Sequence, residues 1–180
     1  MGLHLTPNPS LLTYQMELYM RKLAILILGL LISACGFHLR GQATLPFETL
    51  YVNASNDSPS ATELKRALLA GTNARLSDNP KDAEAIFQLV SETREKQILS
   101  VNTGGTVAEY ELRMRVSFRL YDNKGQNLIA PTEITLKRDV SYNDTNVLAK
   151  DYEEAQLYKD MQSDAVQQVV QRMSGAKAPL

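Results

Sequence analysis

The clearest pattern in the sequence is a strict alternation of apolar and polar residues over residues 109–120. One face is apolar and holds Tyr110, Leu112, Met114, Val116, Phe118 and Leu120. The opposite face is polar and holds Glu109, Glu111, Arg113, Arg115, Ser117 and Arg119. A period of two predicts an antiparallel strand with one buried face.

Turn residues follow this strand and predict a hairpin. Residues 122–125 read Asp-Asn-Lys-Gly, which is typical turn chemistry. A second alternating segment at about residues 133–142 forms the return strand. Pro131 near its start predicts an edge strand or a bulge, because proline cannot donate to a sheet ladder.

Two other segments carry apolar residues at helical spacing. Ser58 and Pro59 predict the start of the first, since serine caps helix N-termini and proline suits the first helical position. Gly71 or Asn73 is expected to end it. The second covers about residues 151–173, and its apolar stripe consists of Ala155, Tyr158, Met161, Ala165, Val169 and Met173.

The remaining segments complete the predicted order of elements. A short strand is expected at residues 50–54 and a less regular one at residues 83–101, followed by a glycine turn at residues 102–105. The polar residues 91–97 are expected to project past the core. The order β-α-β-β-β-α predicts an α+β fold, a two-layer sandwich with two helices packed on one face of a mixed four-stranded sheet.

The N-terminal part of the chain carries an export pattern. Residues 23–32 form an unbroken apolar run that is too short for a membrane helix, which needs about 20 residues. Arg21 and Lys22 precede the run, and Cys35 follows it. The alternative is a core helix or membrane anchor that ends in cysteine, but the flanking charges and the run's length favour an export signal.

We therefore predict three regions. Residues 1–19 are an upstream extension or a misassigned start, residues 20–34 are a lipoprotein signal peptide, and residues 35–180 are one mature domain facing the periplasm. Translation is expected to begin at Met20, with Met16 as the other candidate.

The end of the signal, Ile32-Ser33-Ala34-Cys35, resembles the lipobox of bacterial lipoproteins. The resemblance implies cleavage before Cys35 after a diacylglyceryl group is attached to its sulfur. Two or more acyl chains anchor a protein stably to a membrane. Gly36 follows, where an aspartate would resemble an inner-membrane retention signal, so an outer-membrane location is expected.

Composition limits the chemistry. The chain has a net charge of −1, two histidines and one cysteine. His4 precedes the signal and His38 lies beside the predicted anchor. A Cys–His pair, a histidine-rich zinc site and a Ser-His-Asp triad are therefore excluded. We predict no catalytic residue, no metal, no cofactor and no nucleic-acid partner, since the latter calls for a strongly basic face.

The polar face of the long strand permits two interpretations. Arg113, Arg115 and Arg119 point the same way, with Lys137 expected beside them. They form either exposed cross-strand ion pairs with Glu109, Glu111, Glu133 and Asp139, or a contact for a phosphorylated lipid or an acidic partner.

Three short motifs carry a family resemblance. They are Cys-Gly-Phe-His-Leu-Arg at residues 35–40, Ala-Glu-Tyr at residues 108–110 and Leu-Ala-Lys-Asp at residues 148–151. Their order and setting resemble the LptE family of lipopolysaccharide-assembly lipoproteins. The resemblance implies a non-enzymatic protein that plugs the lumen of the outer-membrane barrel LptD. It also implies that the protein assists the folding of that barrel and helps deliver lipopolysaccharide to the outer leaflet.

The same resemblance implies that Lys150, at the start of the last helix, contacts lipopolysaccharide. The family places an arginine before the glycine turn, where this chain has Asn102 and Thr103. Arg94 or Lys96 on the preceding strand is a candidate substitute. The alternative function is an auxiliary scaffold lipoprotein of another envelope transport system, and a cell-wall hydrolase is a distant third.

Overall fold

The computed structural model describes residues 19–23, 43–55, 57–142 and 146–179. The chain separates into two compact units, Met1–Gly41 and Gln42–Leu180. In the first unit, residues 19–23 are helical. The predicted lipid-attachment residue Cys35, with Gly36 and His38, lies outside the described residues. No described helix combines the length and the apolar character needed to cross a membrane.

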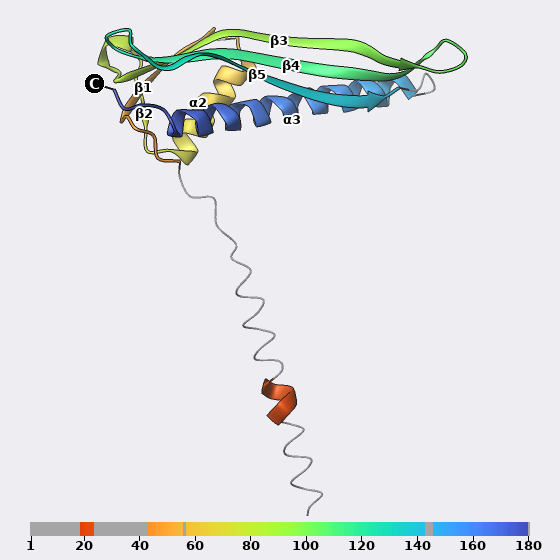
Figure 1. Cartoon of the computed structure of the whole chain (residues 1–180), viewed down its shortest axis with the longest axis horizontal. Coiled ribbons are helices and arrows are strands. Elements are labelled where there is room, and N and C mark those ends of the chain that lie inside the picture. The colour runs from red at the N-terminus through yellow and green to blue at the C-terminus, as the bar shows by residue number, and fades with distance from the viewer. Residues whose placement is uncertain (1–18, 24–42, 56, 143–145, 180) are drawn as a thin grey trace, which may run out of the picture. The chain divides into compact units, whose positions relative to one another are not determined.

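The second unit is built on one five-stranded sheet (Figure 1). Its strands are β1 (Thr49–Asn53), β2 (Arg75–Leu76), β3 (Ala85–Val101), β4 (Val107–Asp122) and β5 (Asn127–Ser141). They lie in the order β2-β1-β3-β4-β5. β1 is parallel to β2 and β3, whereas β3, β4 and β5 form an antiparallel meander.

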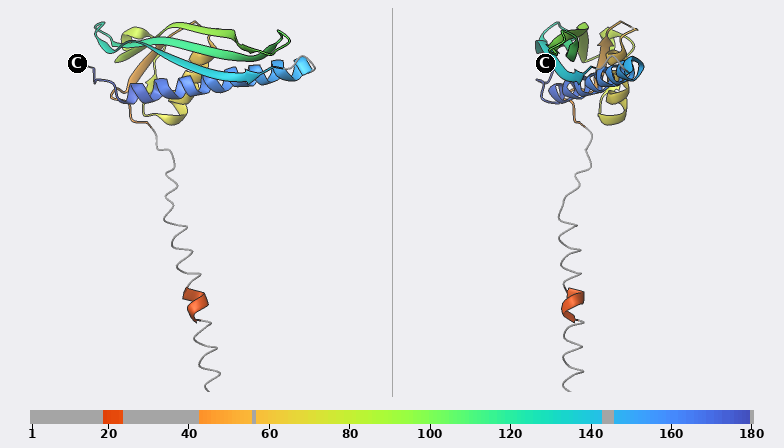
Figure 2. Two further views of the ribbon diagram at one scale, coloured as in Figure 1. Left: turned by 45° about the vertical axis from the view of Figure 1, so that its right-hand side comes forward. Right: turned by 90° about the vertical axis from the view of Figure 1, so that its right-hand side faces the viewer.

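The two helices of this unit cover one face of the sheet (Figure 2). They are α2 (Pro59–Gly71) and α3 (Val147–Ser174), and a short 3-10 turn, η1 (Pro80–Asp82), precedes β3. The predicted two-layer α+β sandwich is confirmed, but the sheet has five strands instead of four. The additional strand, β2, has only two residues, which is too short for a period to appear in the sequence.

Local sequence explains where α2 begins. The Oγ of Ser58 accepts a hydrogen bond from the backbone N–H of Ala61 at 3.1 Å, and Pro59 is the first helical residue. This side chain therefore satisfies one of the N–H groups that a helix start leaves unpaired. The helix ends at Gly71, as predicted, with Thr72 as its C-cap.

The start of α3 differs from the prediction by one turn. The helix begins at Val147 and not near residue 151, so Asp151 lies in its second turn and the first turn contains no acidic residue. The predicted apolar stripe is buried from Tyr158 onward, whereas Ala155 is exposed. The stripe therefore contacts the core only along the C-terminal part of the helix.

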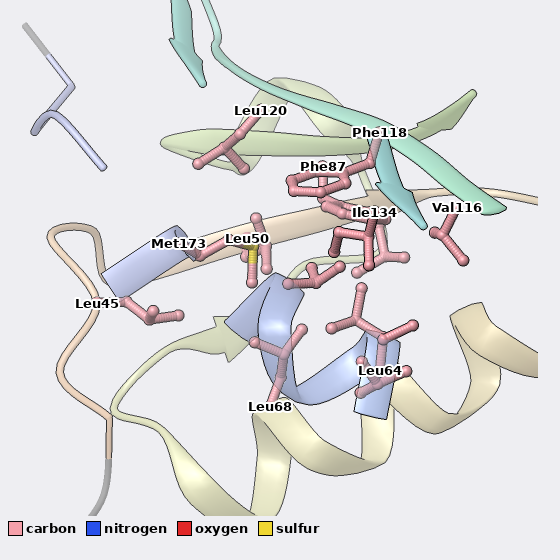
Figure 3. Close-up of a cluster of buried hydrophobic side chains, with 14 of the residues drawn as sticks. Leu45, Leu50, Leu64, Leu68, Phe87, Val116, Phe118, Leu120, Ile134 and Met173 are labelled. Atoms are coloured by element: carbon pink, nitrogen blue, oxygen red, sulfur yellow. The ribbon is translucent and has the colours of Figure 1, made fainter. Parts of the chain in front are cut away.

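The core lies between this part of α3, α2 and the sheet (Figure 3). Leu112, Met114, Phe118 and Leu120 are fully buried, which confirms the predicted inner face of β4. The rings of Phe87 and Phe118 stack with their centroids 5.5 Å apart. Leu64 and Leu68 of α2 complete the packing from the helical layer.

Both hairpins use glycine at a turn position with a positive φ. Gly105 has a φ of 78° between β3 and β4, and Gly125 has a φ of 85° between β4 and β5. Glycine adopts this conformation without the steric cost that a Cβ would add. Pro131 lies in β5, which is an edge strand with a register shift near that residue, so both parts of the prediction hold.

Candidate functional site at the distal end

A β-bulge at Val90 determines which side chains of β3 face the helices. Leu89 pairs with Phe118 of β4, but Ser91 pairs with Ser117, so Val90 has no partner across the strand pair. A one-residue shift moves the following side chains to the opposite face. After the bulge, Arg94 lies opposite Met114 and Lys96 opposite Leu112, on the face that α3 covers.

This arrangement corrects one prediction. Residues 91–97 do not project past the core; they stay paired with β4, and their inward side chains contact α2 and α3. Glu92 accepts a hydrogen bond from Ser58 at 3.0 Å. The helix-covered face of the sheet thus changes from apolar to charged along β3.

Two of the predicted site residues, Arg94 and Lys96, line one surface cleft. The cleft has a volume of about 430 Å³ and lies between β3 and the N-terminal half of α3. We call it the distal cleft, and its lining residues are Arg94, Lys96, Asp151, Glu154, Ala155 and Tyr158. Nothing in the strand periodicity alone indicated that these two cations face a helix.

Each cation in the distal cleft has partners within the molecule. Lys96 Nζ lies 2.6 Å from Glu154 Oε2 and 4.3 Å from the ring centroid of Tyr110. Arg94 donates to Gln162 Oε1 at 2.9 Å, and its guanidinium lies 5.6 Å from the centroid of the Tyr158 ring. The two side chains therefore hold α3 against the sheet.

The protonation equilibria reflect these contacts. The hydrogen bond from Lys96 to Glu154 raises the pKa of Lys96 above its usual 10.5, although partial burial opposes the shift. Burial raises the pKa of Tyr158 above 10.0. The Tyr158 hydroxyl donates to the backbone carbonyl of Glu95 at 2.7 Å. At neutral pH, Lys96 is a cation and Tyr158 a neutral donor.

Lys150 lies beside the distal cleft but does not line it. Its Nζ is 2.8 Å from Glu153 Oε2 and donates to Ser141 Oγ at 3.2 Å, and 22% of the side chain is exposed. The structure therefore places Lys150 where the end of β5 meets the first turn of α3. Its neighbour Asp151 is the residue that faces the cleft.

Large apolar side chains are exposed around this end of the molecule. We call it the distal end; it comprises the β3–β4 hairpin tip at residues 98–107 and the start of α3 at residues 146–152, which lie at the same end in both figures (Figures 1 and 2). Leu148 is 85% exposed and Tyr152 75%. On the hairpin, Ile98, Leu99 and Val101 are also exposed. The pattern of alternation gave no warning of this surface.

The predicted arginine face lies on the opposite, uncovered side of the sheet. Arg113 pairs with Glu111, and Arg115 Nη1 lies 2.8 Å from Glu95 Oε1. Arg119 donates to Gln88 Oε1 at 2.7 Å. The expected cross-strand ion pair between Lys137 and Glu111 forms, at 3.1 Å, whereas the Arg113–Glu111 pair lies within β4.

Two of the other acidic residues expected on this face, Glu109 and Glu133, accept hydrogen bonds from serine or threonine hydroxyls. Glu109 accepts from Ser100, and Glu133 accepts from Ser117 and Thr135. The hydrogen bonds from Lys137 and Arg113 lower the pKa of Glu111 below its usual 4.5. These arginines already have polar partners within the chain. Their contact with a phosphorylated lipid or an acidic partner stays a prediction.

Several contacts between the elements were not predicted from the sequence. Arg138 of β5 lies opposite Leu112 and pairs with Asp164 of α3 at 2.6 Å, although the alternation placed no cation on that face. Gln162 donates to Glu63 of α2 at 2.5 Å and so joins the two helices. No group of three or more histidine, cysteine, aspartate or glutamate residues suited to a metal occurs within the described ranges.

Comparison with known proteins assigns the family. A sequence model of the family described as "LptE: Lipopolysaccharide-assembly" matches residues 47–173, which include β1 through nearly all of α3. This chain belongs to the LptE family. The match confirms the resemblance that the short motifs indicated.

Relatives and solved structures agree with this assignment. An LPS-assembly lipoprotein LptE of Yersinia enterocolitica is 28% identical over 84% of this chain and 75% of its own length. Another from Pectobacterium atrosepticum is 27% identical over 84% and 85%. The solution structure of an uncharacterized lipoprotein B from Nitrosomonas europaea is 43% identical with a TM-score of 0.68, covering 77% of this chain and 90% of that one.

A crystal structure of the rare lipoprotein B from Shewanella oneidensis shows the same fold. It is 26% identical with a TM-score of 0.64 and covers 71% of this chain and 95% of that one. The fold of this chain therefore matches those of LptE-like lipoproteins.

Proposed function

We propose that this chain is a lipid-anchored, non-enzymatic assembly factor for lipopolysaccharide transport at the outer membrane. The observation that carries the proposal is the LptE family match over residues 47–173 in a chain with the corresponding fold. Curated relatives named as LPS-assembly lipoproteins support the same role. The finer proposal is that the domain plugs the LptD barrel from the periplasmic side and assists its folding.

The anchor is part of this proposal. Cys35 is the only cysteine of the chain and lies three residues after the end of the short apolar run at Ile32. A diacylglyceryl thioether with an additional N-acyl chain would give stable attachment, since a single chain binds a membrane only marginally. Mass spectrometry of the processed N-terminus tests this step, and an unmodified Cys35 would contradict it.

A direct contact with lipopolysaccharide is proposed at Lys150. This ligand combines phosphate groups with acyl chains, and a contact site for it needs cations beside an apolar surface. Lys150 lies within the same two turns of α3 as Leu148 and Tyr152, whose apolar side chains are exposed together on a different face of the helix. Arg94 and Lys96 are proposed as secondary contacts, which would exchange Gln162 and Glu154 for phosphate oxygens.

The experiment compares Lys150→Asp with Lys159→Asp, a charge change of the same size on an exposed position of the same helix. We expect Lys150→Asp to weaken lipopolysaccharide binding about tenfold or more, because a charged hydrogen-bond partner is lost and a like charge is introduced. Lys159→Asp should leave binding unchanged. Equal binding by wild type and both variants would show that Lys150 does not contact lipopolysaccharide.

The barrel partnership needs a separate measurement. The lipidated chain should co-purify from outer membranes with a large β-barrel protein, and Lys150→Asp should not reduce the amount recovered. Recovery of the chain alone, with normal lipopolysaccharide export in cells that lack it, would contradict the proposed function as a whole.

A further inference from the structure

The tip of the β3–β4 hairpin differs in composition from the rest of the chain. Charged residues make up 22% of the sequence, yet residues 97–108 contain none. Within this uncharged segment Ile98, Leu99 and Val101 are each about half exposed or more. Single exposed apolar side chains are ordinary, whereas a cluster of large ones marks a contact surface. The tip therefore has the character of a surface that meets an apolar partner.

The turn at this tip satisfies four of its backbone N–H groups internally. Asn102 Oδ1 accepts hydrogen bonds from the N–H groups of Gly104 at 2.9 Å and Thr106 at 3.1 Å. The carbonyl of Asn102 accepts from Gly105 at 3.0 Å, and the N–H of Asn102 donates to the carbonyl of Thr106 at 2.9 Å. A backbone group without a partner is costly in an apolar environment. These N–H groups can therefore leave water without losing their hydrogen bonds.

The turn at the other end of β4 has the same hydrogen bonds but carries charges. Asp122 Oδ1 accepts from the N–H groups of Lys124 and Gln126, and the carbonyl of Asp122 accepts from Gly125. Asparagine and aspartate serve equally well as the acceptor in such a turn. The geometry of the turn thus does not require a neutral sequence. The lack of charge at residues 97–108 reflects instead what surrounds the distal end.

The start of α3 adds apolar side chains at the same end of the domain (Figures 1 and 2). Leu148 and Tyr152 lie one helical turn apart and are exposed together on one face of the helix. Tyrosine combines an apolar ring with a hydroxyl and is typical of the boundary between water and acyl chains. Two elements that are distant in sequence therefore expose apolar groups at one end.

Flexible acyl chains suit this surface better than another sheet or a flat protein face does. Register shifts after Ile98 and after Ser100 interrupt the pairing of β3 with β4, so the tip is not a regular strand pair. Its apolar side chains and those of α3 lie on separate elements. An acyl chain can follow both elements because its bonds rotate freely.

We propose that the distal end packs against the acyl chains of lipopolysaccharide. The side chains that make this contact are Ile98, Leu99, Val101, Leu148 and Tyr152. The proposal rests on the proposed function and adds to it, because the contact proposed at Lys150 concerns the phosphate groups. It is compatible with one copy of the domain inside a barrel, since only the end of the domain meets the lipid.

Two probes separate the acyl contact from the phosphate contact: intact lipopolysaccharide, and the same molecule with its acyl chains removed. Binding of each is measured with the full lipidated chain held in phospholipid nanodiscs. Leu99→Asp and Leu148→Asp should each raise the dissociation constant for the intact probe about tenfold or more, because a charge replaces an apolar contact. Both variants should bind the deacylated probe like wild type. Lys150→Asp should weaken binding of both probes.

Leu69→Asp is the matched control, since Leu69 lies on α2 and its exposure falls between those of Leu99 and Leu148. It should bind both probes like wild type. Circular dichroism of every variant separates a lost contact from a lost fold. If Leu99→Asp and Leu148→Asp bind intact lipopolysaccharide like this control, the inference is overturned and the proposed function stands. A wild type that binds neither probe would contradict both.

Photocross-linking in cells supplies a positional readout. A photoreactive diazirine residue in place of Leu99 or Leu148 should cross-link lipopolysaccharide, and mass spectrometry should place the new bond on an acyl chain. The same residue in place of Asn123, in the turn at the other end of β4, should give no such adduct. Adducts only with phospholipid, or only with a protein, would overturn the proposal and identify that molecule as the partner of the distal end.

Discussion

Lys96 of β3 contacts side chains from three other parts of the fold. Its Nζ pairs with Glu154 of α3, lies 4.3 Å from the Tyr110 ring of β4, and lies 6.0 Å from the Tyr142 ring that follows β5. The two tyrosines meet edge to face with their centroids 5.2 Å apart. One cation thus links the sheet to the distal half of the helix.

We expect Lys96→Ala to lower the free energy of unfolding by about 1 kcal/mol, the combined contribution of a half-exposed ion pair and a cation–π contact. Lys159→Ala is the control, since Lys159 is an exposed lysine of α3. Urea unfolding followed by circular dichroism measures both. Equal stability of the two variants would mean that the contacts of Lys96 do not contribute to the free energy of unfolding.

The pH dependence of the Lys96 contribution follows from its raised pKa. A base whose pKa is higher in the folded state than in the unfolded state stabilises the fold fully below its unfolded value of about 10.5. That contribution is lost as pH rises through the folded pKa. The stability difference between wild type and Lys96→Ala should therefore be constant from pH 7 to 9 and should shrink above about pH 10.5. Urea titrations at several pH values test this.

At the scale of elements, substituting alanine for each of two serines at the start of α2 should change stability in opposite directions. Ser58 Oγ caps the helix and donates to Glu92, whereas Ser60 Oγ is buried without a hydrogen-bond partner among the described residues. Ser58→Ala should cost about 1–2 kcal/mol of stability. Ser60→Ala should be neutral or stabilising, because it removes an unsatisfied hydroxyl from an apolar site. Thermal unfolding of the pair checks both signs, and a larger loss for Ser60→Ala would refute this account of the helix start.

Features that depend on neighbouring residues in the sequence were predictable, whereas features that depend on how two strands pair were not. The alternation in β4 predicts which face of that strand is buried, and the cap residue of α2 predicts where that helix begins, because both signals lie within the element or directly beside it. The bulge at Val90 depends on how β3 pairs with β4, and no residue in β3 announces it. As a result, only the register between β3 and β4 reveals that Arg94 and Lys96 face α3.

The same reasoning explains the misses at the candidate site. Arg138 occupies an inward position of β5 because Asp164 on α3 neutralises it, and that partner is 26 residues away in sequence. The first turn of α3 carries no acidic residue and no side-chain cap, so the usual start signals pointed one turn too late, to Asp151. Contacts between distant elements, and not local preference, decide these positions.

At the scale of the whole folded unit, the interface between helices and sheet has two chemically different halves. Around α2 it is apolar, with Leu64, Phe118 and Met161 buried. Toward the distal end ion pairs and hydrogen bonds are added to it, among them Lys96–Glu154 and Arg94–Gln162, whose cations line the distal cleft. Screening by salt weakens half-exposed ion pairs but does not weaken apolar burial. The two halves should therefore respond differently to the solvent.

This difference predicts that the distal half of α3 opens locally without global unfolding. Local opening is favoured where few apolar contacts are buried and polar contacts are exposed. In hydrogen-exchange measurements, residues 147–157 should exchange faster than residues 158–173, and raising salt should accelerate exchange in the first segment only. The Lys96→Ala variant should mimic high salt at residues 147–157 and leave the second segment unchanged. Uniform protection along α3, or equal acceleration of both segments, would show that the helix opens as one unit and that the polar half is not separately labile.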